Sequence, residues 1–232
     1  MNIKVIRIAS GKAGVGRTTF AVNFATALSQ LGKRVLLVDG DMVGAEVATE
    51  LGITGVQVGF REVFYYKMDV KKAIIRYDES NLDVLPAVKN EENFSPTPDQ
   101  IRSLGAQIDL FDYDFIIVDT AVDFYLPQFA LYYTNSMVVT TPDESSIDAT
   151  LRLVSQYTES KLRFDIVLNR YRNADYELKT DEIEGILHKK LCAVLPEDEI
   201  VIKSTNMHRP AYLMNKEANY CKAVAALAKD YL

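Results

Sequence analysis

The chain has few of the residues that cross-link secreted domains or bind metal ions. Its 232 residues include only two cysteines, Cys192 and Cys221, and only two histidines, His188 and His208. The cysteines lack the short spacing of a zinc site and lie in apolar stretches, so buried free thiols in a reducing compartment are the simplest interpretation. Neither histidine has a partner at metal-ligand spacing, so we expect both on the surface.

Long apolar runs and an excess of positive charge are also missing. No stretch approaches the roughly 20 apolar residues of a membrane-spanning helix, and residues 1–4 lead into a strand pattern rather than a signal peptide. Lys and Arg number 26 against 32 Asp and Glu, which gives a net charge of -6. This balance provides no general attraction to nucleic acid or anionic membranes. We therefore expect a cytoplasmic protein that does not bind membranes directly.

Short apolar segments rich in β-branched residues alternate with longer helical patterns along the whole chain. Nearly continuous hydrophobicity is typical of parallel strands buried on both faces. The expected strands are 5–9, 35–38, 82–85, 115–118, 137–140 and 166–168, and the expected helices are 17–31, 98–109, 145–160, 179–190 and 217–231. The alternation predicts an α/β fold with a doubly wound, mainly parallel sheet and helices on both faces. The loop-like segment 89–98 is too short to separate domains, so residues 1–232 are expected to form a single domain.

A glycine-rich segment joins the first expected strand to the first expected helix. It nearly matches the phosphate-binding pattern G-x-x-x-x-G-K-[ST], except that arginine replaces lysine. Its residues are Gly11, Lys12, Ala13, Gly14, Val15, Gly16, Arg17, Thr18 and Thr19. The glycines permit a tight turn whose N–H groups surround an anion, and the helix N-terminus adds its own positive end. Thr18 is placed to bind Mg²⁺ and Thr19 to contact an α-phosphate, although a ligand-free strand–helix turn would share these features.

Two further expected strands end in aspartate. Asp39 and Asp41 follow the second strand, and Asp119 ends the strand 115–118. Carboxylates at the C-terminal edge of a parallel sheet face the same crevice as the phosphate loop. Asp119 is suited to hold a water bound to Mg²⁺. Taken alone, Asp39 and Asp41 would be better explained by an ordinary strand-end turn, in which Asp-Gly is favoured.

The C-terminal third offers candidates for recognition of a base. Asn169 and Arg170 follow the strand 166–168, and Pro196, Glu197 and Asp198 follow a later apolar stretch. The N-K-x-D arrangement of guanine-specific sites is absent, whereas an asparagine amide can pair with adenine. An ordinary loop-initiating asparagine is the alternative. No serine elbow or Cys/His pair indicates nucleophilic catalysis.

The glycine-rich segment resembles the deviant Walker A motif, K-G-G-x-G-K-[ST], of the MinD/ParA family of P-loop ATPases. The resemblance extends over nearly the whole chain, including Asn169 and the segment 195–210, which is similar to the family's adenine-side loop. It implies a Rossmann-like P-loop NTPase fold and binding of ATP with Mg²⁺. By the same resemblance Lys12 reaches the nucleotide of a partner subunit, Asp41 orients the attacking water, and Asp39 lies near the Mg²⁺ shell.

The chain departs from the family pattern at three places. Ala13 replaces a glycine, Arg17 replaces the lysine that contacts phosphate, and the segment 120–123 replaces a Pro/Ala-Gly turn. Arginine is a wide planar donor rather than a compact point charge, so it keeps the charge of lysine without its geometry. In the segment 120–123, Val122 removes a glycine's close approach and Asp123 adds negative charge. These changes affect the expected hydrolysis more than the expected binding.

The resemblance implies an ATP-dependent switch that forms a homodimer, contacts a protein partner and positions or partitions a cargo. The alternative is a non-hydrolysing scaffold, for which the aromatic patches Phe64-Tyr65-Tyr66 and Tyr132-Tyr133 would offer partner surface, although buried aromatics are commoner. A related metal-delivery ATPase would need a surface cysteine pair, and a small-molecule kinase would need a lid. DNA binding remains a further possibility because the chain carries scattered basic residues, although such residues more often form a solvated face. They are Arg152, Lys161, Arg163, Arg170, Arg172, Lys189 and Lys190.

Overall fold

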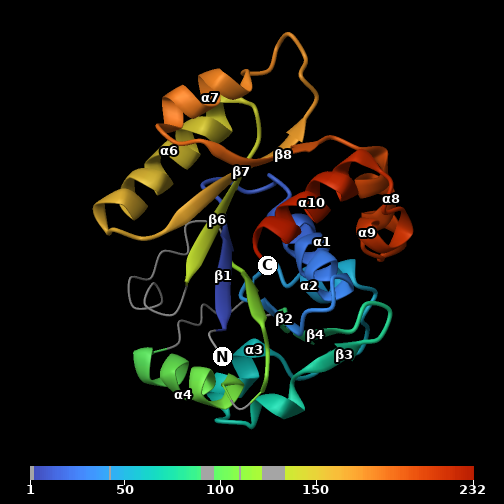
Figure 1. Cartoon of the computed structure of the whole chain (residues 1–232). Helices are drawn as coiled ribbons and strands as arrows, with labels where there is room; N and C mark the ends of the chain where they lie inside the picture. Colours follow the sequence, from blue (N-terminus) through green and yellow to red (C-terminus); the bar gives the residue numbers. More distant parts are fainter. Residues whose placement is uncertain (1–2, 42, 90–96, 110, 122–133) are drawn as a thin grey trace.

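The computed structural model describes residues 3–41, 43–89, 97–109, 111–121 and 134–232. These residues form an eight-stranded sheet in the order β3-β4-β2-β5-β1-β6-β7-β8 (Figure 1). The strands are β1 Lys4–Ala9, β2 Val35–Asp39, β3 Ile75–Tyr77, β4 Leu82–Leu85, β5 Phe115–Asp119, β6 Asn135–Thr140, β7 Phe164–Tyr171 and β8 Leu191–Pro196. Only β3 pairs antiparallel among the described strands. The prediction of a doubly wound, mainly parallel sheet is confirmed.

Helices cover both faces of this sheet. They are α1 Arg17–Gln30, α2 Val47–Glu50, α3 Phe60–Tyr65, the 3₁₀ helix η1 Val70–Lys72, α4 Pro98–Ile108, α6 Glu144–Glu159, α7 Thr180–Leu187, α8 Glu199–Met207, α9 Ala211–Met214 and α10 Asn219–Asp230. Each of the five expected helices is present. The expected helix 179–190 ends early, at Leu187, because His188 adopts a left-handed conformation with φ 51° and β8 begins at Leu191.

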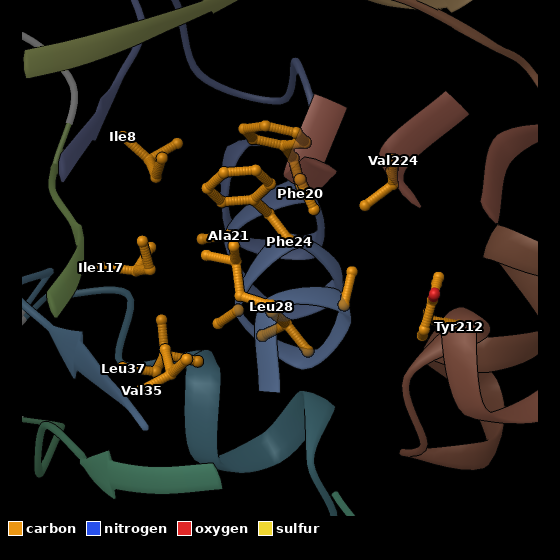
Figure 2. Packing of buried hydrophobic residues seen from close by; sticks show 14 of the residues in the cluster. Ile8, Phe20, Ala21, Phe24, Leu28, Val35, Leu37, Ile117, Tyr212 and Val224 are labelled. Atoms are coloured by element: carbon orange, nitrogen blue, oxygen red, sulfur yellow. The ribbon is translucent and has the colours of Figure 1, made fainter. Parts of the chain in front are cut away.

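The face that carries α1, α9 and α10 holds the largest hydrophobic cluster. Figure 2 shows Ile8, Ile117 and Leu37 of three neighbouring strands on the side of the sheet that faces α1, whose Phe20, Phe24 and Leu28 lie opposite them. The two phenylalanine rings stack with centroids 5.5 Å apart. Helix α1 is buried almost all round because α10 packs on the side that the sheet leaves open. The residues that follow the glycine-rich loop are thereby fixed in position.

The opposite face has two smaller clusters, each under its own pair of helices (Figure 1). Alternation along each strand separates the faces: Val35 and Leu37 face α1, whereas Leu36 and Val38 face α3 and α4. Helices α6 and α7 cover the half of the sheet that contains β6 and β7. The parallel strands therefore end together at one edge, where their connecting loops meet.

Elements that sequence patterns missed are short or lie at the margins. Strand β3 has three residues with Arg76 exposed, and β8 is an edge strand that is buried fully only at Leu195. Such strands lack the continuous apolar signature of the central ones. Among the described residues, no helix is long and apolar enough to cross a membrane.

Candidate functional site

The glycine-rich loop turns tightly between β1 and α1. Gly14 and Gly16 have φ values of 78° and 83°, a left-handed conformation that side-chain-bearing residues rarely adopt. Helix α1 begins directly after Gly16, which has no side chain to cap the helix. The first-turn N–H groups are thus left for an external acceptor, and an anion is the partner that they and the helix dipole favour.

Two close contacts hold the loop against the rest of the fold. A Cβ atom on Gly11 would lie 2.4 Å from the carbonyl oxygen of Ala149 in α6, so only glycine fits there. A Cβ on Gly16 would lie 2.6 Å from Nδ2 of Asn169, which donates instead to the carbonyl oxygen of Val15 at 2.8 Å. Asn169 therefore tethers the loop to the end of β7 with one of the two N–H groups of its side-chain amide.

Arg17 reaches into the centre of the site and is only 9% exposed. Its Nε donates to Oδ1 of Asp119 at 2.9 Å, and its Nη2 donates to Oδ2 of Asp41 at 3.0 Å. Its Nη1 donates to the hydroxyl of Ser10 at 3.1 Å. The planar guanidinium thus binds three groups at once, which a lysine ammonium on its single nitrogen would match only with different geometry.

Two buried carboxyl groups lie side by side at the ends of neighbouring strands. Asp39 of β2 and Asp119 of β5 are partners in the sheet register, and each is at most 1% exposed. Burial and the charge of Asp119 hold the pKa of Asp39 well above its usual range. Burial also raises the pKa of Asp119, while the Arg17 guanidinium opposes that rise. A positive charge is therefore favoured next to Asp39 and Asp119.

The donor set fits a Mg²⁺ ion that keeps water and phosphate ligands. Thr18 donates its hydroxyl to Oδ2 of Asp119 at 2.6 Å, so hydroxyl and carboxylate lie next to each other at the loop. No group of three or more His, Cys, Asp or Glu side chains that could hold a metal ion exists in the described part of the chain. Mg²⁺ characteristically binds through one or two protein oxygens and substrate phosphates, which suits this pair.

The remaining polar residues of the loop have partners from outside it. Lys12 forms an ion pair with Asp143, Nζ to Oδ1 3.3 Å, at the N-cap of α6. Hydrogen bonds from Thr141 and Ser146 help hold the pKa of Asp143 at about 2, although burial opposes them. Thr19 donates its hydroxyl to Oε1 of Glu50 at 2.7 Å. Burial raises the pKa of Glu50 to about 7, with the hydrogen bond from Thr19 opposing the rise.

A cavity of about 320 Å³ opens beside the loop and extends to α8. It is lined by Gly16, Thr19, Asn169, Arg170, Pro196, Glu197, Asp198, Val201, Ile202, Thr205, Asn206 and Tyr220. Arg170 has φ 58° and lies at an irregularity in the β7–β8 register, which turns the backbone at the cavity wall. Asp198 caps α8 by accepting from the backbone N of Ile200 at 3.1 Å. The predicted site residues of the C-terminal third thus line the same cavity as Gly16 and Thr19 of the glycine-rich segment.

The structure brings together all the described site residues that the sequence predicted. Val122 and Asp123 of the altered turn, together with Tyr132 and Tyr133, lie outside the described residues. Sequence reasoning missed Ser10, Glu50, Asp143 and Tyr220. The only signal for Ser10 is its position directly before the loop, and none of the other three belongs to a recognisable pattern.

Predictions about isolated residues had mixed outcomes. Cys221 is buried, but Cys192 is only partly buried, which corrects the prediction of two buried thiols; burial raises the pKa of each to about 12. Both histidines are exposed, as predicted. The expectation that the aromatic patches are buried is confirmed for Phe64, which is 4% exposed, and is wrong for Tyr65 and Tyr66, which are 61% and 66% exposed at the end of α3.

Comparison with known proteins places this geometry in a family. A family model described as an AAA domain matches residues 3–167. An uncharacterised ATP-binding protein of Methanocaldococcus jannaschii is 32% identical over 232 residues, covering 96% of this chain and 85% of the relative. The septum site-determining protein MinD of Synechocystis is 28% identical over 227 residues, covering 92% of this chain and 83% of MinD.

The solved structure of the septum site-determining protein MinD of Pyrococcus horikoshii complexed with Mg-ADP superposes with a TM-score of 0.85 at 25% identity, over 99% of this chain and 96% of that one. The chain belongs to the MinD/ParA family of P-loop ATPases. In the P-loop of this chain, Arg17 stands at the position of the motif's phosphate-contacting lysine and forms ion pairs with Asp41 and Asp119.

Proposed function

We propose that this MinD/ParA protein binds ATP together with Mg²⁺ in the cytoplasm and acts as a nucleotide-dependent switch. The observation that carries the proposal is the convergence of the glycine-rich loop, the buried pair Asp39 and Asp119, and a cavity of about 320 Å³ at one sheet edge. Loop and helix N–H groups suit phosphates, the carboxylates suit a hydrated cation, and the cavity suits a base.

Each predicted residue then has a role in the proposed complex. The backbone of residues 11–19 would surround the phosphates, with Thr18 on Mg²⁺ and Thr19 on the α-phosphate. Asp39 and Asp119 would hold waters of the Mg²⁺ shell, and Asp41 would orient the attacking water. Asn169, Arg170 and the segment 196–198 would line the base. Bound Mg²⁺ supplies charge neutralisation at the phosphates.

The proposed switch depends on a homodimer and on a further protein partner. Lys12 lies at the mouth of the site and is 42% exposed, held by a single ion pair to Asp143. An exposed pair of this kind contributes at most about 1 kcal/mol, so Lys12 is free to exchange Asp143 for the phosphates of a second subunit. In the proposed cycle ATP would stabilise the dimer, hydrolysis would release it, and a partner would recognise the dimer during positioning of a cargo.

Calorimetric titration with ATP in the presence of Mg²⁺, with GTP as control, tests the binding proposal. We expect micromolar, ATP-selective binding, followed by an ATP-dependent increase in mass in light scattering. Absence of heat at millimolar ATP would contradict the proposal. Equal affinity for GTP would contradict the assignment of the base site.

A non-hydrolysing scaffold is the second candidate, and the contacts of Arg17 favour it. The guanidinium forms ion pairs with both Asp119 and Asp41. Its positive charge therefore already neutralises one carboxylate proposed for Mg²⁺, Asp119, and the one proposed for the attacking water, Asp41. Arg17→Lys separates the two candidates in an ATPase assay. A switch that retains hydrolysis holds or gains activity in this variant, whereas a scaffold remains inactive in both forms.

A further inference from the structure

Tyr220 lies at the start of α10 and lines the cavity beside the phosphate loop. Its side chain is 1% exposed, and its hydroxyl has no hydrogen-bond partner within the part of the chain that the structure describes. Buried hydroxyl groups nearly always have a partner, because leaving one unpaired is costly. The sequence motifs that this chain shares with the family do not include this residue.

Two charged residues near Tyr220 are connected to this cavity. Burial raises the pKa of Tyr220, the charge of Glu50 raises it further, and the charge of Arg170 lowers it. Glu50 is the hydrogen-bond partner of Thr19, and both Thr19 and Arg170 line the same cavity. Tyr220 therefore belongs to the part of the cavity that connects the first turn of α1 to the end of β7.

A hydrogen bond also fixes the backbone of Tyr220. The N–H of Tyr220 donates to Oδ2 of Asp198 at 3.3 Å, and Asp198 itself caps α8 through Ile200. The tyrosine is thereby tied to the segment 196–198 that lines the cavity. The side chain of Tyr220 is also part of the large cluster under α1, which limits its rotation.

We infer that the Tyr220 hydroxyl is a further ligand contact, which hydrogen-bonds to the base end of a nucleotide bound in this cavity. The inference rests on the proposed function and adds a residue to it. The triphosphate is expected at the loop, whereas Tyr220 shares the cavity with Asn169, Pro196 and Ile202, away from the first glycines of the loop. A hydroxyl both donates and accepts, so it matches the mixed donor and acceptor edge of a purine.

Tyr220→Phe tests this inference because it removes the hydroxyl and keeps the ring. We expect the Kd for ATP with Mg²⁺ to rise about three- to tenfold, the range for one net hydrogen bond. We also expect the melting temperature of the nucleotide-free variant to stay equal or to rise, because an unpaired buried hydroxyl is lost. A tyrosine that mattered only for packing would not produce this combination.

Tyr231→Phe is the matched control. Tyr231 follows the same helix, but its hydroxyl donates to Oδ2 of Asp165 at 2.6 Å and accepts from Nδ2 of Asn135 at 2.9 Å, next to the cavity at the opposite edge of the sheet. Removal of the Tyr231 hydroxyl should lower the melting temperature and leave the Kd for ATP unchanged.

The outcomes separate failure of the inference from failure of the proposed function. If wild-type protein binds ATP and Tyr220→Phe binds it equally well, the hydroxyl has no role in recognition and the inference is wrong. A lower melting temperature of nucleotide-free Tyr220→Phe would also overturn it, by showing a hydrogen bond inside the protein. If wild-type protein itself fails to bind ATP, the proposed function is at fault and the inference falls with it.

Discussion

Arg17 and Asp119, 102 residues apart in the chain, form a buried ion pair in which Nε donates to Oδ1 at 2.9 Å. The pair joins the first turn of α1 to the end of β5, directly beneath the glycine-rich loop. A residue in this loop position is expected to contact phosphate, yet here its guanidinium is engaged with protein carboxylates. We therefore expect ATP binding to depend on whether Arg17 exchanges these carboxylates for phosphate.

Arg17→Lys should bind ATP more tightly than the wild type, by about tenfold. A lysine ammonium loses the simultaneous contacts with Asp119, Asp41 and Ser10, so less is given up when it turns to phosphate. The same loss should lower the melting temperature of the nucleotide-free variant. Calorimetry with ATP and a thermal melt measure both effects, and weaker ATP binding by the variant would show that the guanidinium itself binds phosphate.

Arg17→Met should destabilise the protein by about 3 to 5 kcal/mol at pH 7.5, because it leaves a buried carboxylate without its charge partner. The effect should shrink toward pH 5, since burial already raises the pKa of Asp119 and protonation then removes the unpaired charge. Urea unfolding at both pH values measures the difference. Lys190→Met, which removes an exposed ion pair with Glu184, is the control and should leave the free energy of unfolding nearly unchanged at either pH.

Glu50→Gln should be more stable than the wild type at neutral and higher pH. The pKa of Glu50 is raised from 4.5 to about 7 in the folded protein. Between these two values the unfolded chain loses its proton while the folded chain keeps it, so the wild type loses stability as the pH rises. The advantage of the variant should be absent below pH 4.5, grow to at most about 3 kcal/mol near pH 7, and stay constant above. Denaturant unfolding at several pH values tests this, and a pH-independent difference would contradict it.

Gly16→Ala and Gly14→Ala form a matched pair within the loop. Both residues have positive φ, so an added methyl group costs about 1 to 2 kcal/mol in either place. Only at Gly16 would the new Cβ collide with Nδ2 of Asn169, 2.6 Å away; at Gly14 no atom lies within 4 Å. Gly16→Ala should therefore lose more stability and also break the Asn169–Val15 hydrogen bond. Equal unfolding free energies for the two variants would show that Asn169 does not hold the loop.

The central strands and the major helices were predictable because each carries its own periodic signature. Strand β2 is apolar and fully buried, and its residues face helices on both sides. The short edge strand β3 and the partly exposed β8 were missed, since their residues depend on neighbours from other parts of the chain. The single-domain organisation stays a prediction.

The residues of the site likewise fall into those that local sequence patterns predict and those that they do not. The glycine-rich loop and the strand-end aspartates are local patterns, because a tight turn before a helix and a carboxylate after a buried strand are specified by adjacent residues. Glu50, Asp143 and Tyr220 have no such pattern and join the site only through long-range packing of α2, α6 and α10.

The sequence by itself determined the kind of site and the family resemblance, because the order of strand, glycine loop, helix and strand-end carboxylate is a local and linear property. Only the tertiary structure decided what Arg17 does. Its partners Asp41 and Asp119 lie 24 and 102 residues away, and they meet the guanidinium because parallel strands β2 and β5 end side by side beneath the loop. A buried charge takes the partners that the fold places within its reach, and no local pattern encodes that choice.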